Sequence, residues 1–476
     1  MVAFAWVLVP CAVVLAGVTV RWFLQRRQTF WPRHGIPAAH NPHLLYGNVA
    51  GLVAKHHTAT ILQTLYREFR ERHLPAGGFN LFFSPVLLVV DRKLIERVLV
   101  KDFAQFQDRG LYASDKVNPL SSETLFSQSG ERWHRMRHQM VAAFGTGSVR
   151  TMFSTTARIA QTLVVYIGAQ GKRRDLEWTD LMARYTTDVI GSCAFGIDCR
   201  TIRDPGTEFR EMGYRAFRCS LRRMWKLRFG YAFRRIADVL QLCVNEPSVE
   251  RFFLQLCRST VLHRESYQMV KRDFLQLLLE MKANGQLDMT QVAGQCYSFF
   301  IAGFETSASL MSFCLYELAK NETVQGKLRG TIVAALDETD GQLSYDMVMS
   351  LGYLDQVVNE TLRMYPPVDF LFRVANTDYP IDRFGTIPRG TLLVVPVHAL
   401  HHDPAYYPQP EVYDPERFAS EPKVNRKRQD APFMPFGMGP RHCIGTTFGL
   451  MLVKVGLVAM LRSFRFSLVV DRTPET

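Results

Sequence analysis

A chain of 476 residues with 47% hydrophobic residues can bury a large core, and its formal net charge of +13 favours an anionic partner, either acidic phospholipid or an acidic protein surface. Its nine cysteines are odd in number and include no C-x-x-C pair, which argues against a disulfide framework or a zinc site and indicates a reducing compartment. The composition also argues against nucleic acid as a partner, because the sequence has no glycine-lysine phosphate loop and its basic residues are scattered rather than interleaved with aromatic ones.

The first predicted element is a transmembrane helix over residues 1–20, which are almost wholly apolar and about long enough to span a bilayer. Three arginines follow, at positions 21, 26 and 27, so the positive-inside rule places the rest of the chain in the cytosol. A cleaved signal peptide is the alternative. It is less favoured because no basic region precedes the apolar run and because Trp6 and Trp22 suit anchoring at the membrane interface.

Residues 21–42 are predicted to form a basic linker whose proline and glycine residues cannot continue a helix. Beyond it, long amphipathic helical patterns dominate to about residue 340, with one strand-like stretch at residues 86–90. Residues 373–396 alternate as short strands with turn residues. The sequence therefore predicts a mainly α fold with a small β region, in one cofactor domain over residues 43–476.

A helix of about thirty residues, and so about 45 Å long, is predicted over residues 290–320, with its first residue as the N-cap. Inside it, the small residues Ala302 and Gly303 either let a bound group approach the backbone or form a plain packing notch. Thr306 lies one turn further on, where its hydroxyl can hydrogen-bond to a bound group or to a water molecule. Glu305 is the neighbouring acid for a proton path.

Two further pairs of residues share a predicted helix face. Trp133 and Arg137 are four residues apart, and Glu360 and Arg363 are three apart on a helix that ends near Pro366. A charged pair at this spacing, taken alone, is usually a surface ion pair.

Near the end of the chain, residues 436–445 place one cysteine, Cys443, between glycines, with Arg441 two residues before it. A cysteine can offer its thiolate to a haem iron from such a loop if the chain turns sharply at Gly439 and Gly445 and aims backbone N–H groups at the sulfur. The alternative is a buried structural cysteine beside a glycine turn.

Residues 436–445 match the haem-binding signature of the cytochrome P-450 family, Phe-x-x-Gly-x-Arg-x-Cys-x-Gly, at every fixed position. The two helical pairs match the W-x-x-x-R and E-x-x-R motifs of that family, and the matched elements follow in the expected order. The chain therefore resembles this family. Its stretches 118–121, 188–199 and 299–307 are similar to the insect family-6 branch almost word for word.

The resemblance implies the cytochrome P-450 fold and a haem b whose iron is bound by the Cys443 thiolate. It places three further residues against the cofactor: Phe436, Ala302 and Gly303. It assigns the haem propionates to Trp133, Arg137, Arg109, Arg373 and Arg441. It also implies that Arg417 joins Glu360 and Arg363 in a buried triad that braces the cysteine loop. Loss of one member, at about 3–5 kcal/mol, would then empty the haem site.

The activity implied by the resemblance is that of a haem-thiolate monooxygenase in the endoplasmic reticulum membrane, with a cytosolic catalytic domain. Such an enzyme inserts one oxygen atom of O2 into a lipophilic xenobiotic or endogenous substrate, with Thr306 and Glu305 guiding protons. Its electrons come from NADPH through NADPH-cytochrome P-450 reductase, and a contribution from cytochrome b5 stays open. The substrate-facing candidates are mainly apolar and comprise residues 111–126, 212–233 and 368–372, with Phe299 and Phe304. Asp369 is either a substrate contact or a solvent-facing turn residue.

Two departures from the family pattern leave alternatives open. Thr446 and Thr447 stand where an arginine is common, which removes a basic residue from the expected reductase-docking surface. The residues that could compensate are Arg132, Arg135, Lys427 and Arg428. The chain also stops before a C-terminal hairpin that lines the substrate pocket in relatives, so a haem-binding pseudoenzyme or carrier is an alternative function. An isomerase that needs neither reductase nor dioxygen is disfavoured by the intact Thr306.

Overall fold

The computed structural model describes residues 14–15, 17–19, 21, 29–40, 42–43, 46–52, 56–82, 84–170, 176–217, 221–382, 384–419 and 431–468. The predicted transmembrane helix of residues 1–20 lies outside these residues, except for 14–15 and 17–19. The chain forms two compact units. The sheet unit comprises Met1–Arg109, Asp369–Asp403 and Gly437–Arg441, and the helical unit comprises Gly110–Val368, Pro404–Phe436 and His442–Thr476.

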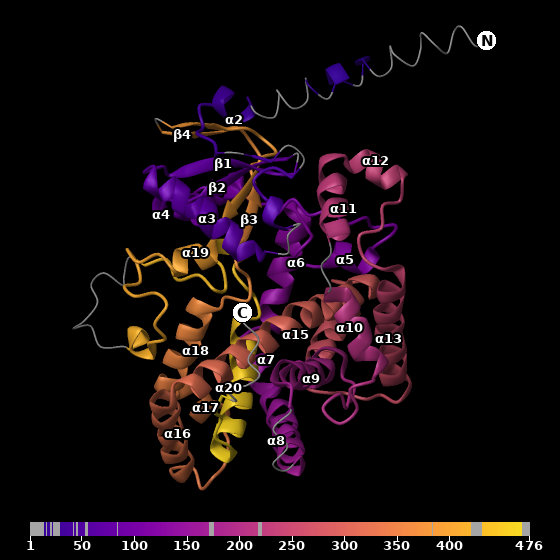
Figure 1. Cartoon of the computed structure of the whole chain (residues 1–476). Coiled ribbons are helices and arrows are strands. Elements are labelled where there is room, and N and C mark those ends of the chain that lie inside the picture. Colours follow the sequence, from indigo (N-terminus) through magenta and orange to yellow (C-terminus); the bar gives the residue numbers. More distant parts are fainter. Residues whose placement is uncertain are drawn as a thin grey trace, which may run out of the picture. The chain divides into compact units, whose positions relative to one another are not determined.

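The described strands of the sheet unit are β1 (Ala76–Leu81), β2 (Ser84–Val89), β3 (Leu371–Val374), β4 (Tyr379–Ile381), β5 (Gly385–Ile387) and β6 (Leu392–Val395). Four of them form one sheet in the order β1-β2-β6-β3 (Figure 1). β2 is antiparallel to β1 and parallel to β6, and β3 is antiparallel to β6, while β4 and β5 form a separate antiparallel pair. β6 is wholly apolar and buried along its length, as expected for a central strand.

The helices of the sheet unit are α2 (Phe30–Arg33), α3 (Thr58–Glu71), α4 (Arg92–Glu96) and α19 (Val397–His401), with short helical turns η1 (Ala50–Leu52), η2 (Arg97–Lys101), η3 (Phe103–Gln105) and η7 (Gly439–Arg441). α3 begins where the His57 ring accepts a hydrogen bond from the backbone N–H of Ala59. Its apolar face includes Phe69, whose ring lies against β1 at Gly77, where a side chain would collide with it. Helix α3 is thus held on the sheet by a close approach that only glycine permits.

The helices of the helical unit are α5 (Pro119–Glu123), α6 (Gly130–Ala143), α7 (Thr146–Thr151), α8 (Phe153–Ala169), α9 (Trp178–Ile190), η4 (Gly191–Phe195), α10 (Glu208–Phe217), α11 (Leu221–Ala232), α12 (Arg234–Val239), α13 (Pro247–Ser266), α14 (Phe274–Ala283), α15 (Met289–Lys320), α16 (Glu322–Asp337), α17 (Tyr345–Ser350), α18 (Gly352–Met364), η5 (Pro415–Phe418) and α20 (Thr446–Ser463). The longest, α15, contacts α5, α9, α13, α18 and α20 and so carries the core of this unit (Figure 1).

Helix α15 starts two residues earlier than predicted. Its N-cap is Asp288, whose carboxylate accepts from the backbone N–H of Gln291, while the Gln291 side chain accepts from the backbone N–H of Asp288. This reciprocal capping box satisfies two backbone donors at once. The predicted cap at Thr290 was therefore wrong, although the helix itself ends at residue 320 as expected.

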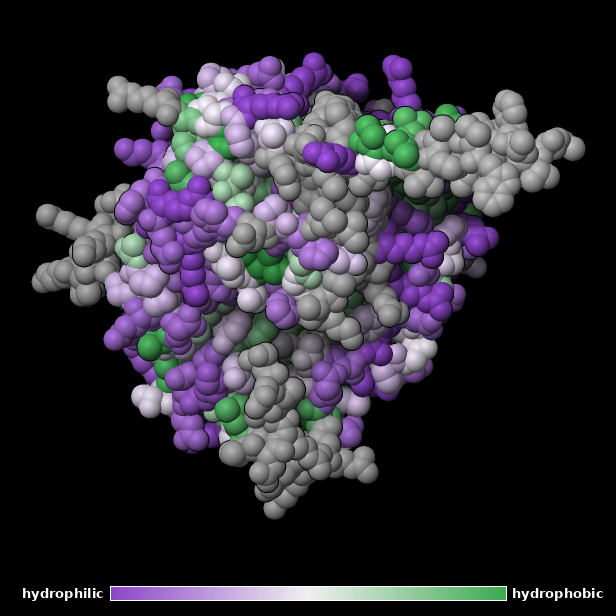
Figure 2. All heavy atoms as spheres, turned by 45° about the horizontal axis from the view of Figure 1, so that its top comes forward, coloured by the Kyte–Doolittle hydropathy of each residue, from purple (hydrophilic) through white to green (hydrophobic). Residues whose placement is uncertain are grey.

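In the part of the chain that the structure describes, two helices are long and apolar enough to cross a membrane, α15 and α20. Half of the apolar window of α15 and 67% of that of α20 are buried inside the structure, as in core helices of a soluble domain. The face drawn in Figure 2 is mainly hydrophilic, with its hydrophobic residues in small separate groups. A mainly α fold with a small β region is thus confirmed; β1, which contains two adjacent glycines, was not predicted.

Candidate functional site

Cys443 lies in the helical unit just before α20, with an exposed side chain. Its backbone N–H donates to the carbonyl oxygen of Phe436 at 2.8 Å. The other described cysteines are buried or half-buried: Cys193, Cys199, Cys243, Cys257, Cys296 and Cys314. Burial raises the pKa of Cys193 and of Cys314 to about 12, so these two remain neutral thiols at physiological pH. Cys443 is therefore the described cysteine best placed to act as a thiolate.

Arg137 on α6 brings positive charge to the cysteine loop. Its Nη1 donates to the carbonyl oxygen of His442 at 3.0 Å. Burial lowers the pKa of Arg137, and the electrostatic influence of Cys443 opposes that shift. A nearby guanidinium and a helix N-terminus both favour the ionised form of a cysteine, and Cys443 has both. Trp133, one turn earlier on α6, is buried.

The glycines of the motif have different backbone conformations. Gly437 and Gly439, in the sheet unit, have φ angles of +75° and +71°, in the left-handed region that favours glycine. A Cβ at Gly439 would also collide with the carbonyl oxygen of Leu99. Gly445, in the helical unit, has an ordinary φ of −89° and caps α20. The expected sharp turn is therefore present at Gly439 but not at Gly445, and a second one occurs at Gly437.

Residues 107–109 of the sheet unit, which include Arg109, are bonded to Arg441 and to the strand that carries Arg373. The Arg441 side chain donates from Nε to the carbonyl oxygen of Gln107 at 3.1 Å, with Nη2 3.8 Å from the Asp108 carboxylate. Arg109 donates to the carbonyl oxygen of Arg441 at 3.2 Å. β3, which carries Arg373, is joined to the same segment by a hydrogen bond from the Val374 N–H to the Asp108 carbonyl at 2.8 Å.

Arg373 is a buried cation, only 2% exposed. Its Nη1 donates to the carbonyl oxygen of Phe372 at 2.7 Å, but among the described residues its Nε has no hydrogen-bond partner. Burial lowers the pKa of Arg373 to about 10. A buried guanidinium in this situation is stabilised by an anionic group, and a haem propionate is a carboxylate that fits this requirement.

Helix α15 presents predicted residues on three of its sides. At 100° per residue, Gln295, Ala302 and Thr306 fall within about 40° of one another, and we call them the α15 stripe. Ala302 is exposed, whereas its helical neighbours are half-buried or buried, and the Thr306 hydroxyl donates to the Ala302 carbonyl at 2.6 Å. The stripe is thus open at Ala302.

Gly303 and Glu305 point away from this stripe. A Cβ at Gly303 would come within 2.8 Å of the Ile190 side chain of α9, so the glycine allows the two helices to cross closely, as in the packing alternative. A cofactor contact for Gly303 stays a prediction. Glu305 lines an open hollow of about 720 Å³ together with residues of α10, and burial raises the pKa of its carboxyl group.

The structure brings Glu360, Arg363 and Arg417 together inside the helical unit. Arg363 donates to both carboxylate oxygens of Glu360, at 2.8 and 2.9 Å, and both side chains are fully buried. Arg417, on η5, lies 3.4 Å from the same carboxylate. Burial raises the pKa of Glu360, and the two guanidinium groups oppose that rise. Their role in bracing the cysteine loop stays a prediction.

Other predicted residues have surroundings that the sequence did not indicate. Arg132, expected on a docking surface, is paired with Asp115 and Glu123, whereas Arg135 is exposed. Lys427 and Arg428 lie outside the described residues. No local pattern marks the acids that pair with Arg132, because the contacts span 17 and 9 residues of chain.

The interpretation of Asp369 as a solvent-facing turn residue was wrong. Its side chain is 18% exposed, lies 4.0 Å from the His57 ring, and has one buried oxygen without a hydrogen-bond partner among the described residues. Burial raises the pKa of Asp369, and His57 opposes that shift. The substrate-contact interpretation stays a prediction.

Comparison with known proteins agrees with the resemblance. Residues 37–476 match the family model described as Cytochrome P450. The chain is 37% identical to cytochrome P450 6a2 of Drosophila melanogaster, over 94% of this chain and 91% of that protein. It is 39% identical to probable cytochrome P450 6a13 of the same species, over 97% and 92%, and 38% identical to cytochrome P450 6A1 of Musca domestica, over 95% and 91%. These similarities give no support to the alternative of a pseudoenzyme or carrier.

Proposed function

The chain belongs to the cytochrome P450 family and is a haem-thiolate monooxygenase, and from this premise we propose that it inserts one oxygen atom of O2 into a lipophilic small molecule, with Cys443 as the thiolate ligand of haem b. When bound, the haem supplies the iron at which dioxygen is reduced, and the thiolate donates electron density that favours cleavage of the O–O bond. The exposure of Cys443, among described cysteines that are otherwise buried or half-buried, is the observation that carries the proposal.

Basic side chains in each unit suit the two haem propionates. In the sheet unit, the buried guanidinium of Arg373 needs an anionic partner, and Arg441 and Arg109 lie in two segments that are hydrogen-bonded to each other. In the helical unit, Arg137 is the cation beside Cys443. We assign the propionates to these arginines, with Trp133 beside Arg137 and Phe436 next to the haem, because paired carboxylates would neutralise charges that burial otherwise penalises.

Thr306 and Glu305 are assigned to proton delivery. The Thr306 hydroxyl lies on the open stripe of α15, where it can exchange its bond to the Ala302 carbonyl for one to a water molecule. Glu305 lines the open hollow beside α10, and its raised pKa makes it a better proton donor near neutral pH than an ordinary glutamate. We assign the two side chains to a proton path between this hollow and the exposed face at Ala302.

The partners and location follow from the same proposal. Electrons come from NADPH through NADPH-cytochrome P450 reductase, with cytochrome b5 as an additional donor to be tested. The substrate is a lipophilic xenobiotic or endogenous compound. The apolar residues 1–20 anchor the chain in the endoplasmic reticulum membrane, with the catalytic domain in the cytosol.

The carbon monoxide difference spectrum of the reduced protein tests the proposal. The full chain, expressed in membranes with haem supplied, is expected to show the strongly red-shifted Soret band of a thiolate-ligated haem. The substitution Cys443→Ala should abolish this band, because no other described cysteine is both exposed and flanked by Arg137.

The control is Cys243→Ala, which removes a half-buried thiol and is expected to keep the band. A wild-type band at the position of histidine-ligated or thiol-ligated haem, or a red-shifted band that survives in C443A, would contradict the assignment. NADPH consumption with added reductase then tests the source of electrons.

A further inference from the structure

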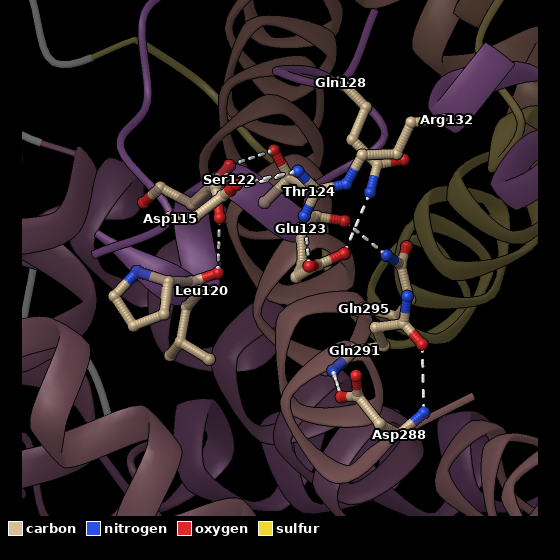
Figure 3. Close-up of polar contacts among 12 residues, drawn as sticks. Asp115, Leu120, Ser122, Glu123, Thr124, Gln128, Arg132, Asp288, Gln291 and Gln295 are labelled. Carbon is tan, nitrogen blue, oxygen red and sulfur yellow. Dashed lines mark hydrogen bonds and ion pairs between the residues drawn. The ribbon is translucent and has the colours of Figure 1, made fainter. Parts of the chain in front are cut away.

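Arg132, in the first turn of α6, joins two parts of the segment 111–126. Its Nη1 donates to both carboxylate oxygens of Asp115, at 3.0 and 3.2 Å, and its Nη2 donates to the carboxylate of Glu123 (Figure 3). The family resemblance makes this segment a candidate to face the substrate, so a role for Arg132 in substrate binding rests on the proposed function.

The two acidic partners of Arg132 contribute unequally to holding the segment 111–126. The Glu123 side chain is 11% exposed and that of Asp115 is 61% exposed. An exposed ion pair contributes little, because water screens it, whereas a buried carboxylate that loses its cation is strongly destabilised. Gln128 also donates to Glu123, at 3.0 Å, but an amide brings no compensating charge. The contact with Glu123 is therefore the stronger of the two that Arg132 makes, although the Arg132 side chain is itself 40% exposed.

Glu123 is at the same time attached to α15 (Figure 3). The Nε2 of Gln295 donates to the Glu123 carbonyl oxygen at 2.6 Å. A Cβ at Gly294 would come within 2.5 Å of the Glu123 Cβ, so α5 lies directly on the surface of α15. Helix α5 is thus joined to Arg132 of α6 and to α15, and its Leu120 backbone N–H also donates to the Glu250 carboxylate of α13 at 2.9 Å.

The place where α5 meets α15 is close to the proposed chemistry. Gln295, which binds α5, belongs to the α15 stripe together with Ala302 and Thr306. Two helical turns, or about 10 Å, separate Gln295 from Ala302. The stripe is covered by α5 at Gln295 and exposed at Ala302, so α5 forms the wall that borders its open part.

We propose that Arg132 is a positioning residue for substrate binding: it holds α5 against α15 as a wall of the substrate site, without touching the substrate itself. Without Arg132, the buried Glu123 carboxylate would recruit water or leave its place, and α5 would move from the stripe. Ligands large enough to touch the wall should then bind more weakly, whereas a ligand that only reaches the haem iron should be unaffected.

Two ligands separate these cases in the haem-loaded full chain. The amine of n-octylamine binds haem iron while its alkyl chain occupies apolar space, and imidazole binds the iron with no such chain. Spectral titration of Arg132→Gln is expected to show about fivefold weaker binding of n-octylamine, equivalent to about 1 kcal/mol, with imidazole affinity changed less than about twofold. The matched control is Arg135→Gln, an exposed arginine on the same helix, which removes the same charge and should leave both affinities unchanged.

Hydrogen exchange measures how firmly α5 is held, without any ligand bound to the haem. Backbone amides of residues 119–124 should exchange faster in R132Q than in R135Q, while amides of α20 stay equally protected in both. If R132Q does not fold, Arg132→Lys replaces it, because a single ammonium keeps the charge but cannot bridge two carboxylates as a guanidinium does. It should weaken n-octylamine binding relative to Arg135→Lys.

Three outcomes are distinguishable. Unchanged n-octylamine affinity and unchanged exchange in R132Q would overturn the positioning role. Equal losses in the Arg132 and Arg135 variants would also overturn it, since they would indicate a general effect of surface charge. A wild-type protein that shows no spectral change with either ligand would instead contradict the haem-binding function on which the role depends.

Discussion

Glu305 and Thr306 are neighbours in the chain, yet their side chains have different surroundings. Thr306 lies on the α15 stripe with its hydroxyl bonded to the Ala302 carbonyl, whereas Glu305 lines the hollow beside α10. The 100° step between successive helical residues produces this division. One residue can therefore take protons from solvent while the next faces the open part of the stripe.

A proton donor at position 305 predicts a specific dependence on pH. Burial raises the pKa of Glu305, so the carboxyl group remains protonated to higher pH than an ordinary glutamate. Turnover that depends on this proton should be present below the folded-state pKa and fall as the pH rises through it. Glu305→Gln should remove this decline and reduce coupled turnover at least about tenfold, measured as product formed per NADPH across pH 5.5–9.

The control is Glu211→Gln, which changes another carboxylate at the same hollow. The same burial penalises ionised Glu305, so the stability that its protonated form contributes is lost as pH rises through the folded-state pKa. E305Q should accordingly unfold at no lower a temperature than wild type at pH 8. A pH profile in E305Q identical to that of wild type would remove Glu305 from the proton path.

At the scale of elements, the cysteine motif joins a helical turn to a helix, and one of its glycines belongs to each. Gly439 opens η7 in a left-handed conformation beside the carbonyl of Leu99, whereas Gly445 caps α20 with an ordinary φ. A Cβ at Gly445 would meet only the ring of Phe144, at an ordinary contact distance of 3.7 Å. The two glycines are equal in the sequence signature but unequal in the structure.

Alanine substitutions should therefore separate them. A left-handed alanine at 439 costs about 1–2 kcal/mol, and its collision with a backbone carbonyl, which cannot rotate away as a side chain can, adds to that cost. Gly439→Ala is expected to lose most of its haem and to unfold at a lower temperature. Gly445→Ala should retain near-normal haem content. Equal haem loss in both variants, measured as haem per protein, would show that conformation is not what distinguishes them.

For the molecule as a whole, the formal net charge is +13, and some of the basic side chains that contribute to it are buried. Arg373 is buried in the sheet unit without an acidic partner among the described residues, and Arg441 is buried beside Asp108 at 3.8 Å. A buried charge such as that of Arg373 destabilises a folded chain unless an anion joins it. Stability is therefore expected to depend strongly on whether haem is present, since a ligand that binds only the folded state stabilises it.

Removal of haem should reverse the effect of one substitution. In haem-free protein, Arg373→Met is expected to be as stable as wild type or more so, by about 1–3 kcal/mol, because an unpaired buried charge is removed. In haem-loaded protein, the same variant should release haem more readily and unfold at a lower temperature. The control Arg389→Met, at an exposed site of the same unit, should have little effect in either state. Destabilisation of R373M to the same degree with and without haem would show that Arg373 has a structural partner rather than a propionate.

The sequence by itself determined the features that depend on short spacing. The i, i+3 relation of Glu360 and Arg363 placed both on one helix face, the apolar pattern and absence of proline indicated α15, and alternation indicated β3 to β6. The cysteine motif, being one contiguous stretch, pointed to Cys443 directly.

Only the tertiary structure decided the contacts between distant elements. It brought Arg417 to Glu360 across 57 residues, paired Arg132 with Asp115 and Glu123, and assigned Gly303 to packing against Ile190. Local periodicity tells which face of a helix is buried, but not which element covers it. That choice depends on how all the helices pack together, and the local sequence does not determine it.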